Sequence, residues 1–274
     1  MLKDITIGQY YPGDSFLHKL DPRTKLVCIF LYMVGLFMVK ELFALSYVVL
    51  FSVVAASFSG VPPKVLLKGL KPLWILIVFT LVLNFFMHSD GVELLRWGFI
   101  SITSGGVSRG LFMALRLCLL INVTSLLTLT TTPIILTDGL ERLMKRLFIP
   151  MAHELAMMMT IALRFIPTLI EETERIMKAQ IARGADFESG GLIAKAKSMT
   201  PLLIPLFVSA FRRADDLAMA MEARCYRGGE GRTRLRQLKY SRRDGVAFVA
   251  SLGFLAFAVV DRYWLGLFAD MIVF

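Results

Sequence analysis

The sequence contains few of the residues that build catalytic and metal-binding sites. Its 274 residues include only three histidines, which lie far apart, and three widely spaced cysteines. An odd number of scattered cysteines indicates neither a disulfide framework nor a zinc cluster. His-Glu-x-x-His is absent, and so is the Gly-x-x-x-x-Gly-Lys-Ser/Thr loop that ATP hydrolysis by this chain alone would require. We therefore expect no catalytic residues, no metal site and no cofactor in this chain.

Charged residues are also scarce, at 19% of the chain, whereas 56% of the residues are hydrophobic. A water-soluble domain cannot bury so much apolar surface, so the lipid bilayer is the expected surrounding. The net charge of +10 could suggest nucleic acid as a partner. Lys and Arg cluster between long apolar runs, however, where they indicate membrane topology and contact with anionic lipid. We expect no nucleic-acid binding.

Long apolar runs predict an all-α, polytopic membrane protein with about five transmembrane helices, since about 20 helical residues cross the hydrocarbon core. The first two runs are separated only by Lys40-Glu41, which we interpret as a tight hairpin of two short spans. A single bent element is the alternative. The five predicted spans are Leu26–Val39, Leu42–Phe58, Pro72–Met87, Leu111–Thr128 and Val246–Val260.

The loop charges predict that the N-terminus is cytoplasmic. Arg23 and Lys25 precede the first span, and three lysines lie between the second and third spans. The loop between the third and fourth spans, residues 88–105, holds only Arg96. Lys and Arg are retained preferentially on the cytoplasmic side, so these loops agree on one orientation.

A segment between the fourth and fifth spans is too charged to cross the membrane and too periodic to be a linker. It predicts three amphipathic helices on the cytoplasmic side, from Pro133 to Pro150, from about His153 to Ala182 and from about Pro201 to Tyr226. We accordingly divide the chain into residues 1–130 with four transmembrane helices, residues 131–242 with these amphipathic helices, and residues 243–274 with the last transmembrane helix.

Each of the two longer amphipathic helices carries an apolar stripe opposite a charged face. Methionine is enriched here, and it suits surfaces that repack against more than one partner, although core filling is an alternative. Apolar stripes of this length beside a bilayer predict a protein partner. The stripes contain Leu155, Met158, Ala162, Phe165 and Leu169 in the first helix and Leu203, Phe207, Ala210 and Ala214 in the second.

The strongest local signal is a repeated tripeptide at the ends of these two helices, Ala182-Arg183-Gly184 and Ala223-Arg224-Cys225. A single arginine there could cap the carbonyls of its own helix, and Gly184 is typical of a helix stop. Two such helix ends favour a second interpretation, in which each end inserts into a binding groove of a partner and the two grooves are similar. Small residues allow deep insertion, and the planar guanidinium matches a carboxylate.

Two features of the predicted fourth span have alternative interpretations. Arg116 either faces the bundle interior or a partner, or its side chain snorkels to the surface from a span that begins later. Gly106–Gly110 has the small-xxx-small spacing of closely packed helices, but with Gly105 beside it we expect a loop.

With these motifs the chain resembles the transmembrane T component of energy-coupling factor (ECF) transporters, which are bacterial vitamin and metal importers. The resemblance covers nearly the whole chain, and its first element is similar to the version shared among several substrate-binding subunits. It rests on Gly8-Gln9-Tyr10-Tyr11-Pro12-Gly13, Leu20-Asp21-Pro22-Arg23-Thr24-Lys25-Leu26, Thr131-Thr132-Pro133 and the two arginine tripeptides.

The resemblance implies a scaffold in the bacterial cell membrane that couples two cytoplasmic ABC-type ATPases to a small substrate-binding membrane (S) subunit, with several interchangeable S subunits. ATP and magnesium would be bound by the ATPases, the tripeptides would dock into them, and the stripes would carry the S subunit. Cys225 departs from the family pattern, which has glycine, and this puts the local backbone in doubt. The alternatives are an intramembrane lipid-modifying enzyme and a stand-alone ion-coupled permease.

Overall fold

The computed structural model describes residues 10–87, 93–97, 100–187, 191–229 and 238–265. The chain forms two compact units. The transmembrane unit comprises Gly8–Gly139 and Leu238–Phe274, and the coupling unit comprises Met1–Ile7 and Leu140–Gln237. Gly8 and Gln9, from the first motif of the resemblance, and the predicted loop residues 88–92 lie outside the described residues.

The described part of the transmembrane unit is mainly helical and contains one short hairpin, in which β1 (Glu93–Trp97) pairs antiparallel with β2 (Ile100–Thr103). The predicted all-α polytopic class is confirmed. Helix α6 (Pro133–Arg146) begins in this unit and ends in the coupling unit. The other α-helices in the described part of the unit are α1 (Pro22–Met38), α2 (Leu42–Ser59), α3 (Pro63–Leu70), α4 (Trp74–Met87), α5 (Ser104–Thr130) and α10 (Arg242–Val260).

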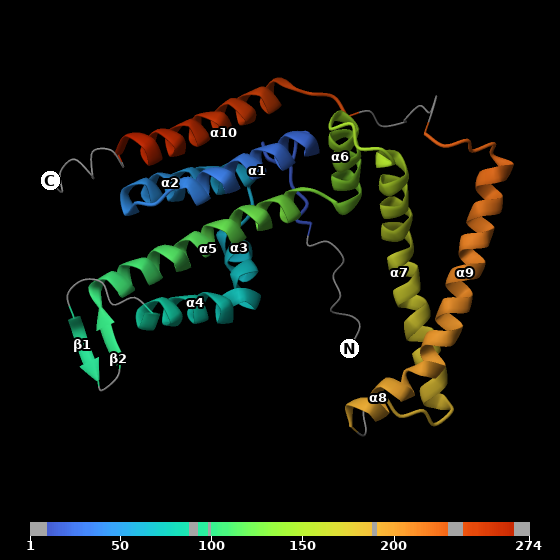
Figure 1. Ribbon diagram of the computed structural model, residues 1–274. Helices are drawn as coiled ribbons and strands as arrows, with labels where there is room; N and C mark the ends of the chain where they lie inside the picture. The colour runs from blue at the N-terminus through green and yellow to red at the C-terminus, as the bar shows by residue number, and fades with distance from the viewer. Residues whose placement is uncertain (1–9, 88–92, 98–99, 188–190, 230–237, 266–274) are drawn as a thin grey trace. The chain divides into compact units, whose positions relative to one another are not determined.

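The first apolar region forms two separate helices, as the hairpin interpretation predicted. Val39 and Glu41 are extended, and they end α1 and begin α2. The core lies where these helices meet α10 and α5, with Phe254 fully buried and its ring centroid 5.2 Å from that of Tyr32. A Cβ atom at Gly35 would come within 2.6 Å of the Phe254 ring, so glycine allows α1 and α10 to lie side by side (Figure 1).

Among the described residues, four helices are long and apolar enough to cross a membrane, and α2 is a shorter apolar helix. One of the four is α7 (Ala152–Ala182), which corrects the expectation that the whole segment after the fourth span is too charged to cross. Helix α5 also begins earlier than predicted, at Ser104. Gly106–Gly110 is therefore helical, and the loop expected there is wrong. Thr103 explains the early start, because its side chain caps α5 by accepting from the Gly106 amide.

Buried polar side chains join the starts of α1 and α10. Asp21 caps α1 by accepting from the Arg23 amide at 2.9 Å, and its carboxylate binds the Arg23 guanidinium at 2.7 Å. The backbone amide of Asp21 donates to Asp244 Oδ1 at 2.8 Å. Asp244 in turn belongs to the capping box of α10, together with Ser241. The Arg23 guanidinium lies 3.9 Å from the ring centroid of Tyr240, which immediately precedes the N-cap of α10.

Lys25 joins this buried polar junction to the end of α5. Its ammonium group donates to the carbonyl of Thr130 at 2.9 Å and to the hydroxyl of Thr131 at 2.8 Å. Thr130 is the last residue of α5, so its carbonyl has no partner within the helix. The sequence Leu20–Leu26, which carries the family resemblance, thus fixes three helix ends at one site.

Arg116 faces the interior of the transmembrane unit, which decides between its two interpretations. Its guanidinium donates to the carbonyl of Val39 and lies 4.7 Å from the ring centroid of Phe112. Val39 follows the last residue of α1, where helix carbonyls are unpaired and carry partial negative charge. A half-buried cation therefore binds the carbonyl at the end of α1.

The coupling unit contains α7, the short helix α8 (Leu192–Ser198), which the sequence analysis did not predict, and α9 (Thr200–Ala223). The predicted bounds of α7 and α9 are close to those observed. Helix α6 ends at Arg146, before Pro150, in a turn where Phe148 and Met151 have positive φ angles.

Helices α7 and α9 are antiparallel. Gln180, near the end of α7, donates to the Pro201 carbonyl at the start of α9 at 3.4 Å. In the middle of the pair, Glu172 and Arg213 form an ion pair at 2.5 Å. Figure 1 shows the two helices meeting beside α8.

We expect Lys25→Met to lower the free energy of unfolding of the full chain by about 1–3 kcal/mol, because it leaves a buried carbonyl and hydroxyl without their donor. The measurement is the thermal unfolding midpoint in mild detergent. Lys19→Met is the matched control, since Lys19 is half exposed and its ion pair with Asp14 spans 3.7 Å. Equal midpoints for the two variants would contradict the structural role of Lys25.

Candidate functional site

The first tripeptide forms a Schellman turn at the end of α7. Ala182 is the last helical residue, Arg183 is the C-cap and Gly184 has a φ angle of +87°. The Gly184 amide donates to the Ile181 carbonyl at 2.9 Å, and the next amide along the chain donates to the Gln180 carbonyl at 3.0 Å. These two bonds define the Schellman motif, in which glycine commonly takes the left-handed position.

The second tripeptide forms the same turn at the end of α9. Arg224 is the C-cap, and the Cys225 amide donates to the Glu222 carbonyl at 2.8 Å. The Tyr226 amide donates to the Met221 carbonyl at 3.0 Å. Cys225 has a φ angle of +55°, so it occupies the position that Gly184 holds in the first turn. The departure from glycine leaves the backbone geometry unchanged, at a strain of about 1–2 kcal/mol for a side chain in this region.

The arginines of these two turns are exposed, as are the other four tripeptide residues. In both turns the carbonyls two and three residues before the C-cap bind backbone amides. Within the described part of the chain, neither Arg183 nor Arg224 forms an ion pair or a side-chain hydrogen bond. The guanidinium groups are therefore not used to cap their own helices.

The antiparallel arrangement places the two turns at opposite ends of the helix pair. The first lies beside the start of α9, through Gln180 and Pro201. The second lies beside the start of α7, because the Tyr226 hydroxyl is 3.5 Å from His153 Nε2. With 24 residues, α9 is roughly 36 Å long, so two separate partner molecules can reach the two turns.

The predicted stripes are only partly buried. In α7, Leu155, Met158 and Ala162 are exposed, whereas Phe165 and Leu169 are half-buried. In α9, Leu203, Ala214 and Phe207, at 60% exposure, are exposed and Ala210 is half-buried.

Sequence reasoning missed part of the α9 surface. Ile204, Val208 and Phe211 are also exposed, and they widen the stripe on the face that holds Leu203 and Phe207. Their spacing at i, i+4 and i+7 was a usable signal. The ion pair between Glu172 and Arg213, by contrast, lies between the two helices. One ion pair thus lies between the two helices, while a broad set of apolar side chains on α9 is exposed.

A buried carboxylate fixes the second turn. Glu141, in the second half of α6, is 3% exposed and binds His153 Nδ1 at 3.0 Å and the Lys145 ammonium group at 3.1 Å. His153 in turn contacts Tyr226, the residue that closes the second Schellman turn. A Cβ atom at Gly229 would come within 2.5 Å of the His153 ring, so the chain after the turn also packs on this histidine. Nothing local in the sequence signals these contacts.

The structure offers no support for catalysis in the residues it describes. No group of three His, Cys, Asp or Glu side chains is placed there to hold a metal ion. Gly106–Gly110 also fits Gly-x-Ser-x-Gly, a hydrolase pattern in which the serine lies at a strand-to-helix turn. Here Ser108 lies within α5 and donates to the Gly105 carbonyl at 3.1 Å.

Apolar membrane-crossing helices and a helix pair with outward apolar side chains define a multi-pass α-helical membrane protein. The chain belongs to the cobalt transport protein family (CbiQ), whose model matches residues 13–235. It is 55% identical to the energy-coupling factor transporter transmembrane protein EcfT of Clostridium kluyveri, over 97% of this chain and 100% of that protein. Proteins of the same name from Acidaminococcus fermentans and Bacillus subtilis are 54% and 49% identical, over 94% and 91% of this chain and 97% and 95% of theirs.

These relatives confirm the resemblance to the transmembrane component of ECF transporters. The chain is a membrane subunit of such a transporter and part of a multi-subunit assembly. The cytoplasmic position of its N-terminus and the roles of the tripeptides and stripes stay predictions.

We expect Cys225→Gly to raise stability by up to about 1 kcal/mol by relieving left-handed strain, and Cys225→Val to lower it, because a β-branched residue is poorly accommodated there. Hydrogen exchange of the Cys225-position and Tyr226 amides measures the turn directly. Gly184→Cys is the reciprocal control and should keep the first turn with slightly faster exchange. Identical exchange rates in Cys225→Gly and Cys225→Val would show that left-handed strain at this position does not determine the stability of the turn.

Proposed function

We propose that the chain is the transmembrane scaffold of an ECF-type ABC importer. In this proposal it couples ATP hydrolysis by two cytoplasmic ATPase subunits to movement of a substrate-binding S subunit, for uptake of vitamins or other micronutrients. The observation that carries the proposal is the pair of matching Schellman turns, each exposing an arginine, at opposite ends of one helix pair.

The two Schellman turns suit the same kind of binding groove on each of two ATPase subunits. A Schellman turn presents the same backbone shape at each end of the pair, and the flanking alanines add little bulk. Each free guanidinium offers a planar, bidentate fork for a carboxylate in the ATPase groove. Because the turns lie at opposite ends, each ATPase would bind one of them. ATP and magnesium would stay with the ATPases, and this chain would hold no cofactor.

The outward apolar surface of α7 and α9 suits the S subunit. Its methionines and exposed aromatic residues can repack, which favours several interchangeable S subunits on one scaffold. Cargo specificity then belongs to the S subunit. A change in the distance between the ATPases would alter the crossing of α7 and α9, which share few polar contacts, and thereby tip the S subunit. The assembly would lie in the bacterial cell membrane with the N-terminus of this chain in the cytoplasm.

Replacing both docking arginines, Arg183→Glu with Arg224→Glu, should leave membrane insertion intact and abolish uptake. Two reversed charges facing carboxylates should weaken ATPase binding by about 100-fold or more, a loss of about 3 kcal/mol. The measurements are copurification of the ATPases and uptake of vitamin by cells.

The matched control for these variants is Arg175→Glu with Arg212→Glu, which makes the same charge change at exposed positions on the same two helices. Uptake that survives in the docking double variant would refute the docking role of the tripeptides.

Removing two exposed aromatic rings, Phe207→Ala with Phe211→Ala, should reduce copurification of the S subunit while the ATPases remain bound. Truncation of an interface anchor costs about 2 kcal/mol or more, so a drop in affinity of at least about 30-fold is expected even if only one of the two rings is an anchor. Phe248→Ala, at an exposed position on α10, is the control. Loss of the ATPases together with the S subunit would indicate a folding defect. Unchanged S-subunit binding would show that this surface is not the binding site of the S subunit.

A further inference from the structure

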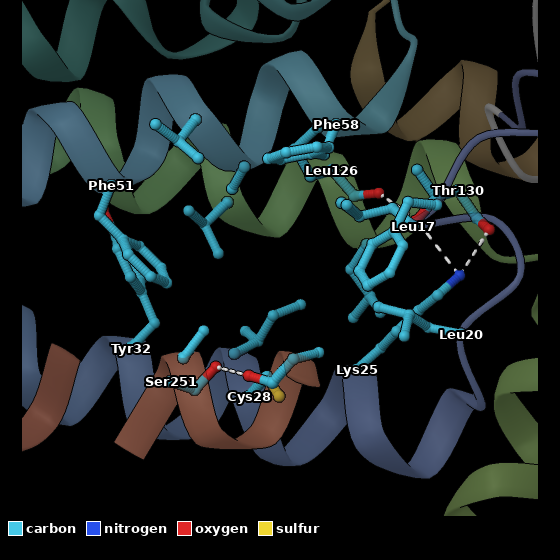
Figure 2. Close-up of a pocket in the computed structure, with 18 of the residues that line it drawn as sticks. Leu17, Leu20, Lys25, Cys28, Tyr32, Phe51, Phe58, Leu126, Thr130 and Ser251 are labelled. Atoms are coloured by element: carbon cyan, nitrogen blue, oxygen red, sulfur yellow. Dashed lines mark hydrogen bonds between the residues drawn. The ribbon is translucent and has the colours of Figure 1, made fainter. Parts of the chain in front are cut away.

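We propose that the transmembrane unit binds one acyl chain of a membrane phospholipid in a pocket among α1, α2, α5 and α10. The pocket has a volume of about 430 Å³, within the range of small-molecule sites. Figure 2 shows Tyr32 and Phe51 at one end, Lys25 and Leu20 at the other, and Phe58 and Leu126 along the wall. The site involves none of the tripeptide or stripe residues.

The lining recognises hydrocarbon because its main polar groups are already paired within the protein. The Lys25 ammonium group binds Thr130 and Thr131, and the Tyr32 hydroxyl lies 2.6 Å from the hydroxyl of Ser52. Ser251 donates to the carbonyl of Ala247 at 2.9 Å. A water molecule needs two to four free polar partners to be held in a cavity, so water is a poor occupant of this pocket.

The dimensions of the pocket fit a lipid chain. Its lining residues run from Lys25 to Tyr32 on α1 and from Phe51 to Phe58 on α2, each a length of about 10 Å along the helix. This is most of the depth of one leaflet, since the hydrocarbon core is about 30 Å thick. The lining also includes Val246 near the start of α10, so the pocket belongs to the leaflet at the start of α1 and α10.

The pocket is continuous with the surface that the bilayer covers. Val54, Phe58 and Val246 line it and are 44%, 59% and 63% exposed. Deeper in the pocket, Tyr32 and Leu126 are only 3% and 4% exposed. An apolar pocket that opens onto hydrocarbon takes up the chains around it, because they restore the dispersion contacts that an empty cavity lacks. Since the pocket supplies no free donor for a headgroup, it should accept different phospholipids equally.

Photo-crosslinking in vesicles tests this site. The full transporter complex is reconstituted in phosphatidylcholine that contains a small fraction of phosphatidylcholine with a diazirine in one acyl chain, and adducts are mapped by peptide mass spectrometry. We expect adducts on Tyr32 and Leu126, which lipid at the outer surface cannot reach, and equal labelling by the phosphatidylglycerol analogue.

Filling the pocket provides the matched comparison. Ala247→Phe should reduce labelling of Tyr32 and Leu126 at least about fivefold, and Ala55→Phe on α2 serves if the first variant does not fold. Ala256→Phe is the control, because Ala256 is exposed on α10 and does not line the pocket.

Two results would overturn the proposal. One is the absence of adducts on Tyr32 and Leu126 in the wild type, whether the pocket is empty or is filled by protein. The other is labelling of these two residues that persists in both filled variants. Neither result bears on the docking of the ATPases, which is tested separately.

Discussion

The buried polar junction at the start of α1 is the interaction on which the transmembrane unit depends. Hydrocarbon offers no hydrogen bonds, so helix ends near the membrane must find their partners within the protein. Asp21, Arg23 and Lys25 provide them for the starts of α1 and α10 and for the last carbonyl of α5. Arg116 does the same for the end of α1. Three residues of one short sequence, together with Arg116, thus fix the ends of several helices whose long faces are apolar.

The coupling unit follows the opposite rule. Polar contacts join its separate elements, at Glu172 and Arg213 and in the cluster of Glu141, His153 and Tyr226, while apolar side chains of α9 are exposed. A surface of that kind is stable only when lipid or another protein covers it. The two ends of the pair formed by α7 and α9 also differ, because Tyr226 joins the second turn to the cluster of Glu141 and His153. In the proposed mechanism, the ATPase bound there would act on a more firmly fixed helix end.

Local signals account for what the sequence could predict. The bounds of α7 and α9, the two-helix hairpin of α1 and α2, and the similarity of the two tripeptides follow from helical periodicity, breaks and C-terminal turns, which depend on adjacent residues. Asp21 with Asp244, and Glu141 with His153, are contacts between distant segments, and one sequence contains no sign of such pairings. The early start of α5 was missed because glycines suggested a loop, whereas Thr103 caps a helix there. The shared backbone of Gly184 and Cys225 was also not predictable, because cysteine rarely takes a left-handed conformation.

The central claim is that one chain joins two ATPases through its two matching turns. Native mass spectrometry of the assembly, purified through this chain from its own membrane in mild detergent, tests that claim most directly. The account predicts a mass equal to one copy of this chain, two ATPase subunits and one S subunit. A transport-active preparation containing this chain alone, or with a single ATPase subunit, would contradict it.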